Sequence, residues 1–540
     1  MFQTGRGCVP TKTLTALCAV LMAGAFQTAS GAVQCVNPAG SSGCQTTIGA
    51  AVSKAASGDT IQVGAGTYKE VVTITMPLSL IGAGSSSTII DATGLANGIV
   101  VISSGALNVS GAVISGFTVQ NANFQGILLQ NVSNVTVWNN QVLNNDKSLN
   151  IVAGACPGIA TIFAQNEADD CGEGIHLTGV DHSVISNNVV QNNAGGILIT
   201  DDTGPTHDNV ISGNLVSNNP YDCGITLAAH GTTGVYHNTI SGNQSLNNGL
   251  KLPGAGAGVG LFAPGPGSQT WANVVINNTL TGNGLPGVTM HNHASVPGAP
   301  PVNFNDNVIV GNIISGNGAD TEDAATPGTA GINIYSVAPI TGTVVSENVI
   351  SQEMIAVAFN APSGQVAAFL NNFMAPTGVD NLGAGTVNAT QNWWGCAAGP
   401  NAGCGVVSGS GVTSSAWLTS PFTSTQLPSP VTPPPPPPNG GGSAVTISVT
   451  GPGGTTSTSN TFTTTSNQIS LNASQSASTN AGTLTYSWTP SAGYASIVIN
   501  GGNTATPTFQ LHSPGTYQVT LTVTDSKGAT ATATVTLQYI

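Results

Sequence analysis

A pair of polar residues five positions apart recurs along most of this sequence, and this repeat constrains the fold more than any other feature. The copies are Asn140/Asn145, Asn188/Asn193, Asn214/Asn219, Asn243/Asn248, Asn278/Asn283, Asn312/Asn317 and Asn348/Glu353. An apolar residue precedes the first member by three positions, as Ile185 and Ile211 do, which is typical of strands with one face packed inward. A strand-like unit that recurs at roughly 20–50 residues predicts a β-solenoid. Stacked at ~4.8 Å from coil to coil, each Asn amide would satisfy turn carbonyls that are otherwise buried and unpaired.

The composition also indicates a nearly all-β protein. Only 7 basic and 21 acidic residues occur among 540, and 70 residues are glycine. Glycine and asparagine permit left-handed turn conformations, whereas valine, isoleucine and threonine favour strands. The formal net charge is −14, and no arginine follows residue 32. Nucleic acid is therefore excluded as a partner, and an anionic sugar would need a divalent cation such as Ca²⁺ as a bridge.

Residues 1–32 have the pattern of a secretory signal peptide. Arg6 and Lys12 form a basic start, an apolar run covers 14–26, and Ser30-Gly31-Ala32 is a small-residue cleavage site. No later stretch is apolar for long enough to cross a membrane. We therefore expect a secreted monomer, extracellular or at the cell surface.

Seven cysteines remain after the signal peptide. Cys35 and Cys44 are close in sequence near one end of the repeats, and Cys396 and Cys404 near the other, which predicts two disulfides. Cys156 and Cys171 are candidates for a third bridge, with Cys223 left single, although the sequence leaves the pairing of these three open. No CxxC pair occurs, which argues against a thiolate metal site.

Both ends of the repeats carry capping sequences. In 46–57, Ile48, Ala51, Val52 and Ala55 fall on one face of a short helix, and a strand follows at 60–63. Such a helix would cover the open edge of the first coil. This segment resembles the N-terminal cap of pectin-lyase-like right-handed parallel β-helices. The phrase QNWWGCAAGPNAGC at 391–404 resembles the terminal signature of secreted bacterial β-helix proteins, including the NosD-like group. The resemblance covers 33–425 and implies that fold; Trp393 and Trp394 would plug the last coil.

The sequence changes character after the repeats. A proline run at 433–438 followed by NGGGS predicts a linker over 426–443. Residues 444–540 are threonine-rich, with the phrases LTYSWTP and GTYQVTLTVTDSKGATATATVTL. Trp488 on one strand and Tyr517 entering another favour a small Ig-like β-sandwich. This segment resembles PKD-type domains of secreted proteins, which implies spacer or adhesive duty.

Acidic residues and histidines gather in one part of the solenoid. The second strand of each repeat reads GIHLTG, GILITDDTG, GITLAAHG or GVTMHNHA, and these align at Ile175, Ile197, Ile225 and Val288. In this alignment Asp202 is level with His230 on the next coil and with His293 two coils further on. Asp201 and His291 lie beside that column. An Asp next to a His fixes the tautomer of the imidazole and raises its pKa.

Alignment on the repeated Asn gives a second column, six residues earlier in each coil. Its members are His182, Asp208, His237, Ala272 and Asp306. Adjacent coils would again place an Asp against a His. Tyr335, Phe262 and Trp271 are candidate aromatics for stacking on a sugar.

These columns lead to the hypothesis that Asp201, Asp202, His207, Asp208 and His230 line an outward groove as catalytic acid/base residues or Ca²⁺ ligands for a polysaccharide. A glycoside hydrolase needs two carboxylates, whereas a lyase needs one base and a neutralising group. The Asp201-Asp202 pair is similar to that of polygalacturonase-type hydrolases, but the Gly-His-Gly and Arg-Ile-Lys elements of that family are absent. The Asp-Asp-Thr-Gly stretch is also a common turn sequence. The alternatives are therefore a polysaccharide lyase or hydrolase and a non-catalytic adhesion or structural protein of the cell surface.

Overall fold

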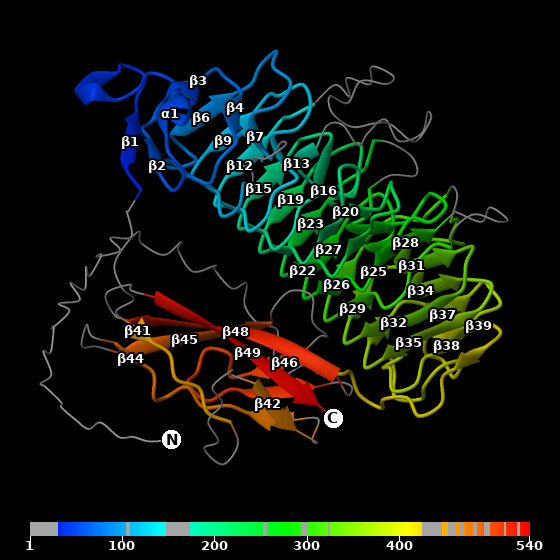
Figure 1. Cartoon of the computed structure of the whole chain (residues 1–540). Helices are drawn as coiled ribbons and strands as arrows, with labels where there is room; N and C mark the ends of the chain where they lie inside the picture. Colours follow the sequence, from blue (N-terminus) through cyan, green and yellow to red (C-terminus); the bar gives the residue numbers. More distant parts are fainter. Residues whose placement is uncertain are drawn as a thin grey trace, which may run out of the picture.

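The computed structural model describes residues 31–103, 109–146, 173–251, 256–292, 301–321 and 324–423 of the solenoid region. In the C-terminal region it describes 445–451, 461–464, 466, 468–478, 483–490, 497–511, 515–525 and 530–539. Nearly all of the predicted signal peptide and the whole predicted linker lie outside these residues. Figure 1 shows the solenoid in blue to yellow and the C-terminal strands in orange and red. No helix within the described residues is long and apolar enough to cross a membrane.

Three long parallel sheets form a right-handed β-helix, which confirms the predicted fold class. Sheet A has fourteen strands: β1 (Val33–Val36), β2 (Thr60–Val63), β5 (Ser79–Gly82), β8 (Val113–Ser115), β11 (Thr136–Trp138), β14 (Val184–Ser186), β18 (Val210–Ser212), β22 (Thr239–Ser241), β26 (Val274–Ile276), β29 (Val308–Val310), β32 (Ile340–Ser346), β35 (Gly364–Phe369), β38 (Thr386–Asn388) and β40 (Val412–Thr413). Sheet B has eleven: β3 (Gly66–Tyr68), β6 (Thr88–Asp91), β9 (Thr118–Gln120), β12 (Gln141–Leu143), β15 (Val189–Gln191), β19 (Leu215–Ser217), β23 (Gln244–Leu246), β27 (Thr279–Thr281), β30 (Ile313–Ser315), β33 (Val349–Ser351) and β36 (Asn372–Met374).

The remaining solenoid strands belong to sheets C and D. Sheet C has twelve: β4 (Val72–Ile74), β7 (Ile99–Ile102), β10 (Ile127–Gln130), β13 (Glu173–Thr178), β16 (Gly195–Thr200), β20 (Ile225–Ala228), β24 (Val259–Phe262), β28 (Val288–Asn292), β31 (Ala330–Ser336), β34 (Ile355–Asn360), β37 (Thr377–Asn381) and β39 (Val406–Gly409). The short sheet D has β17 (Thr206–His207), β21 (Val235–Tyr236) and β25 (Thr270–Trp271). Each coil runs from sheet C, past sheet D where it is present, to sheet A and then sheet B.

The repeated asparagines form two continuous hydrogen-bonded ladders through the interior. Asn214 is typical: its Nδ2 donates to Oδ1 of Asn243 on the next coil at 2.9 Å and to the carbonyl of Ile185 on the preceding coil at 2.9 Å. The first ladder extends from Asn140 to Asn392, and the second from Asn145 to Glu353. The residue before each ladder position has a positive φ, for example 50° at Asn187 and 63° at Gly213, which explains the recurring Asn-Asn and Gly-Asn dipeptides.

The structure adds a third ladder that the sequence analysis missed. Asn209, Asn238, Asn273 and Asn307 stack in the same way, five residues before the first ladder. These residues join sheet D to sheet A, so they fix the register of both. In these coils the five-residue spacing therefore extends to a third asparagine, which precedes the repeated pair. These asparagines are visible in the sequence.

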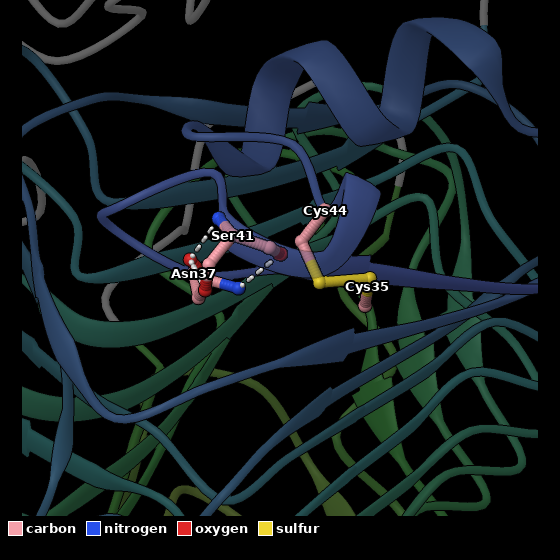
Figure 2. The surroundings of a disulfide bond; sticks show 4 residues. All are labelled: Cys35, Asn37, Ser41 and Cys44. Carbon is pink, nitrogen blue, oxygen red and sulfur yellow. Dashed lines mark hydrogen bonds between the residues drawn. A yellow bond between two sulfur atoms is a disulfide. The ribbon is translucent and has the colours of Figure 1, made fainter.

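Both ends of the β-helix are capped as predicted. Helix α1 (Ile48–Lys54), preceded by the 3-10 turn Ser41–Gly43, buries Ile48, Ala51 and Val52 against the first coil. Figure 2 shows the Cys35–Cys44 disulfide beside this helix, with Asn37 bonded to Ser41. At the other end Trp394 is fully buried and packs edge-on against Phe373, whereas Trp393, which was also predicted to plug the last coil, is only half-buried.

The cysteine predictions can be followed residue by residue. The structure contains the predicted Cys35–Cys44 and Cys396–Cys404 disulfides. Cys223 is a free and buried thiol, as expected for the single residue. The proposed Cys156–Cys171 bridge lies outside the described residues.

The C-terminal strands form the predicted small sandwich. One sheet contains β42 (Thr461–Thr464), β49 (Thr530–Tyr539), β48 (Gly515–Asp525) and β45 (Leu484–Pro490), and the other β43 (Gln468–Ser470), β47 (Thr508–Leu511) and β46 (Ile497–Asn500). A further pair consists of β41 (Val445–Thr446) and β44 (Ala477–Ser478). Trp488 is buried against Phe509 and donates to the carbonyl of Thr504 at 3.1 Å, and Tyr517 is fully buried.

Candidate functional site

The outer face of sheet C carries buried polar side chains that do not belong to the asparagine ladders. From β13 to β34 both faces of most sheet C strands are buried, because inward residues such as Ile175 and Leu177 fill the core while outward ones such as His176 are also covered. The connection between sheets B and C is long here: β12 ends at Leu143 and β13 begins at Glu173, and residues 147–172 lie outside the described residues. The register pairs Ile175, Ile197, Ile225, Val259 and Val288 in succession, so the predicted alignment of these coils is correct.

Asp202 and His230 meet across adjacent coils, as this alignment predicts. Asp202 follows β16, His230 follows β20, and the distance from His230 Nδ1 to Asp202 Oδ1 is 2.9 Å. The side chains are 3% and 9% exposed. Burial raises the pKa of the Asp202 carboxyl, but hydrogen bonds from His230 and Thr200 and the charges of His230 and His176 outweigh it, so the pKa is lowered overall. Because the ionised carboxylate only accepts, His230 donates through Nδ1, and the basic lone pair is on Nε2.

A chain of buried side chains, none of them among the predicted site residues, extends behind this pair. Thr200 donates its single hydroxyl hydrogen to Asp202 Oδ2, so it accepts from His176 Nε2 at 3.0 Å. His176 Nδ1 in turn lies 3.5 Å from Nε2 of Gln125. His176 and Thr200 are fully buried and Gln125 is 4% exposed. The sequence contained a signal for this chain: His176 takes an outward position in GIHLTG, and the same alignment puts Thr200 on that face.

Asp201 has a different environment from its neighbour Asp202. Its side chain accepts from the backbone N–H groups of Gly231 at 2.7 Å, Thr233 at 3.0 Å and Gly234 at 2.7 Å, and from the Thr233 hydroxyl at 3.1 Å. Both carboxylate oxygens therefore bind the turn of the next coil. The predicted five-residue groove is thus divided: Asp201 holds a turn, Asp202 and His230 form a pair, and His207 and Asp208 belong to a second cluster.

The second cluster lies on sheet D, which follows sheet C in three successive coils. His207 Nδ1 is 2.8 Å from Asp208 Oδ2, and His237 Nδ1 is 3.7 Å from Asp208 Oδ1. The rings of His207 and Tyr236 stack at 4.8 Å between centroids, and those of Tyr236 and Trp271 at 5.0 Å. The column predicted from the repeated Asn follows the stacked rings by one residue in each of these coils, and it is also present. All five of its members have a left-handed backbone conformation: His182, Asp208, His237, Ala272 and Asp306.

Two further features complete the polar surface of this region. A hollow of about 390 Å³ lies beside His207 and is lined in part by Asn131, Ser133, Asp181 and Thr203. On sheet C, His291 Nε2 is 3.0 Å from Asp320 Oδ2. The candidate sugar-stacking aromatics Phe262 and Tyr335 both pack edge-on to His291. His293, predicted to share the column of Asp202, lies outside the described residues.

Two family models match parts of this chain. Residues 52–250 match the family described as periplasmic copper-binding protein (NosD), and residues 457–538 match a PKD-domain family. The resemblance to the NosD-like group of β-helix proteins, with a PKD-type C-terminal domain, is therefore confirmed. Together with two disulfides, these matches indicate an exported protein. No curated protein matches the chain.

Three of the solved structures that match this chain are distant in sequence. The catalytic domain of a GH87 α-1,3-glucanase has a TM-score of 0.45 at 15% identity, covering 66% of this chain and 63% of that one. Pectate lyase Pel9A has a TM-score of 0.39 at 14% identity, covering 62% and 77%. DFA-IIIase from Arthrobacter chlorophenolicus A6 without its lid has a TM-score of 0.40 at 14% identity, covering 68% and 89%. Because all three TM-scores are below 0.5, these likenesses carry no inference about this chain.

One further match is partial. A nucleoside hydrolase-related hypothetical protein from Saccharophagus degradans, associated with carbohydrate metabolism, shares 19% identity with a TM-score of 0.16. The match covers 17% of this chain and 25% of that one, so this chain spans a quarter of its length.

Proposed function

We propose that this is a secreted polysaccharide-cleaving enzyme, a lyase or a glycoside hydrolase, that works on the outer face of sheet C. The single observation that carries the proposal is the 2.9 Å contact between Asp202 and His230. An imidazole that is oriented by a buried carboxylate and keeps its Nε2 lone pair is the usual form of a proton-transferring histidine.

In this proposal His230 takes up the proton, and Asp202 orients the imidazole ring of His230. Asp202 also stabilises the imidazolium that forms when Nε2 accepts a proton. Thr200 donates to the second carboxylate oxygen and is itself held by His176, so Asp202 is fixed on both sides. Lyase chemistry needs one such base, which this face supplies, and also a group that neutralises the uronate carboxylate. Hydrolysis needs a second carboxylate within about 10 Å of the first, and the buried Glu173 does not supply it, because it lies against Gly195 at the far end of β16, seven residues before Asp202.

Metal ions have no step in this proposal. Among the described residues no three His, Cys, Asp or Glu side chains are grouped so that they could hold an ion. Both oxygens of Asp201, a predicted Ca²⁺ ligand, already bind the 231–234 turn. The matched family is described as copper-binding. Here the described histidines pair with carboxylates, which does not fit the several nitrogen or sulfur ligands that copper prefers.

The test is cleavage of a polysaccharide panel by the purified full-length protein, with and without EDTA or added Ca²⁺. New reducing ends indicate either class of enzyme, and absorbance from an unsaturated uronate indicates a lyase. We expect His230→Ala to reduce the rate by about 10²–10⁴-fold. The matched control is His512→Ala, in the C-terminal sequence.

The competing function is a non-catalytic adhesion or structural protein. The four hydrogen bonds from the 231–234 turn to Asp201 favour it, because they show an acidic residue of this region serving the scaffold. No cleavage across the panel, or cleavage that His230→Ala leaves unchanged, would support this alternative.

A further inference from the structure

A polar strip runs along sheet D, separate from the Asp202–His230 pair. We define it by the stacked rings of His207, Tyr236 and Trp271, flanked by Asp181, His182, Asp208 and His237. Successive coils contribute one ring each, and the register pairs His207 with Tyr236 and Tyr236 with Trp271. All three rings are only half-buried.

The strip turns hydrogen-bonding groups toward solvent. Because the rings stack face to face, a ligand would contact the edges of the rings. Within the described residues, neither the Tyr236 hydroxyl nor the Trp271 indole N–H has a protein partner, and neither is buried. Their polar groups therefore face water, beside the carboxylates of Asp181 and Asp208.

The imidazoles of the strip are held in a fixed orientation. His182 Nδ1 is 2.7 Å from Asp181 Oδ1, and His207 Nδ1 is 2.8 Å from Asp208 Oδ2. In neutral rings this leaves Nε2 as an acceptor. Burial is the main effect on His237 and lowers its pKa, so that ring is neutral at pH 7. Burial and the nearby Asp208 and Asp181 raise the pKa of Tyr236, so its hydroxyl remains a donor.

The hollow beside His207 extends the strip by one coil. Asp181 and His207 line it together with the amide of Asn131 and the hydroxyls of Ser133 and Thr203. Donors and acceptors are interleaved, which suits a ligand that carries many hydroxyl groups. The strip and hollow contain two carboxylates and no Lys or Arg, so they repel an anionic polymer.

From this arrangement we propose that the strip is a glycan-binding site for neutral, uncharged polysaccharide. It holds polymer next to the sheet C face without taking part in bond cleavage. The site is independent of the proposed catalysis, since none of its side chains contacts Asp202 or His230 among the described residues.

The test is affinity gel electrophoresis of the full-length protein in gels that contain hydroxyethyl cellulose, a galactomannan or polygalacturonate. We expect retardation by a neutral polymer and none by polygalacturonate. Tyr236→Phe keeps the stack but removes the hydroxyl, and we expect it to weaken binding about 3–10-fold. Trp271→Ala, which also breaks the stack, should weaken it further.

Three controls make the result decisive. Trp417→Ala removes an exposed indole elsewhere and should leave retardation unchanged. His230→Ala should also bind normally, which separates this site from the proposed catalysis. Circular dichroism verifies that each variant is folded. The proposal is overturned if the wild type is not retarded by a neutral polymer, if only polygalacturonate retards it, if Tyr236→Phe binds as well as wild type, or if His230→Ala abolishes binding.

Discussion

Sheets C and D of the same coils use the same residue types in opposite ways. On sheet C, Asp202 and His230 are 3% and 9% exposed, and Thr200 and His176 support them from behind. Beside sheet D, where Asp181 bridges to His207 of β17, His182 and Asp181 are 58% and 36% exposed and lie 2.7 Å apart. Burial makes the first pair a place where a proton can be held in a fixed geometry, whereas exposure makes the second a surface for contact. This difference in exposure comes from the side chains that neighbouring coils place above and below each Asp–His pair.

The largest expected effect tests the buried pair. Asp202→Asn keeps the shape of the side chain but removes the charge that fixes the tautomer of His230. We expect the rate of polysaccharide cleavage to fall about 10²–10⁴-fold, with a smaller change in KM. Initial rates across substrate concentrations measure this.

The matched control for this variant is Asp91→Asn, because Asp91 bonds only to Thr93 and Asn121 on an early coil. Equal loss in both variants would mean that Asp202 acts through general stability.

The second prediction compares two aspartates by stability. Asp201→Ala removes the acceptor for four hydrogen bonds from the 231–234 turn and should lower the free energy of unfolding by about 3 kcal/mol. Asp181→Ala, in the exposed strip, should change it by less than about 0.5 kcal/mol. Urea unfolding followed by circular dichroism gives both values. Similar values for the two would remove the distinction between the sheets.

A third prediction concerns a carboxylate inside the ladder. Burial raises the pKa of Glu353 from 4.5 to about 7. The folded state therefore holds the proton more tightly than the unfolded state, so this group makes stability fall as pH rises from about 4.5 to 7. Glu353→Gln keeps an acceptor for Asn317 and should be more stable than wild type at pH 8, by on the order of 2 kcal/mol, and equal at pH 4. Unfolding midpoints at both pH values decide it; a constant difference would contradict the assignment.

The smallest expected effect lies in the exposed strip. Burial lowers the pKa of His237, and Asp208 offsets part of that shift. Asp208→Asn should therefore lower the pKa of His237 further, which an NMR titration of the imidazole can follow. An upward shift would mean that the 3.7 Å contact does not stabilise the protonated ring.

The sequence predicted the scaffold well because every coil repeats the same local rule. Polar residues five positions apart and inward apolar residues specify the ladders, and the alignment at Ile197 and Ile225 was sufficient to place Asp202 against His230. Helix α1 and the disulfide at each end of the β-helix were also predicted from local patterns.

The roles of individual side chains were harder to predict. Asp201 and Asp202 are adjacent in sequence, yet successive side chains at a strand end point in different directions, so one binds a turn and the other an imidazole. Tyr236 was missed because only the column of Asp208 and His237 was compared between coils. Comparing the second residue of THDN, VYHN and TWAN between coils would have revealed the stacked rings, since His207, Tyr236 and Trp271 occupy that position.

The most direct measurement of the central claim is the tautomer of His230 in ¹⁵N-histidine-labelled protein, assigned with His230→Gln. We predict that the neutral form of the ring, reached by raising the pH, carries its proton on Nδ1 and not on Nε2, and that Asp202→Asn weakens this preference. A neutral ring with its proton on Nε2 in the wild type would contradict the account, because the neighbouring coil would then not orient the imidazole for proton transfer.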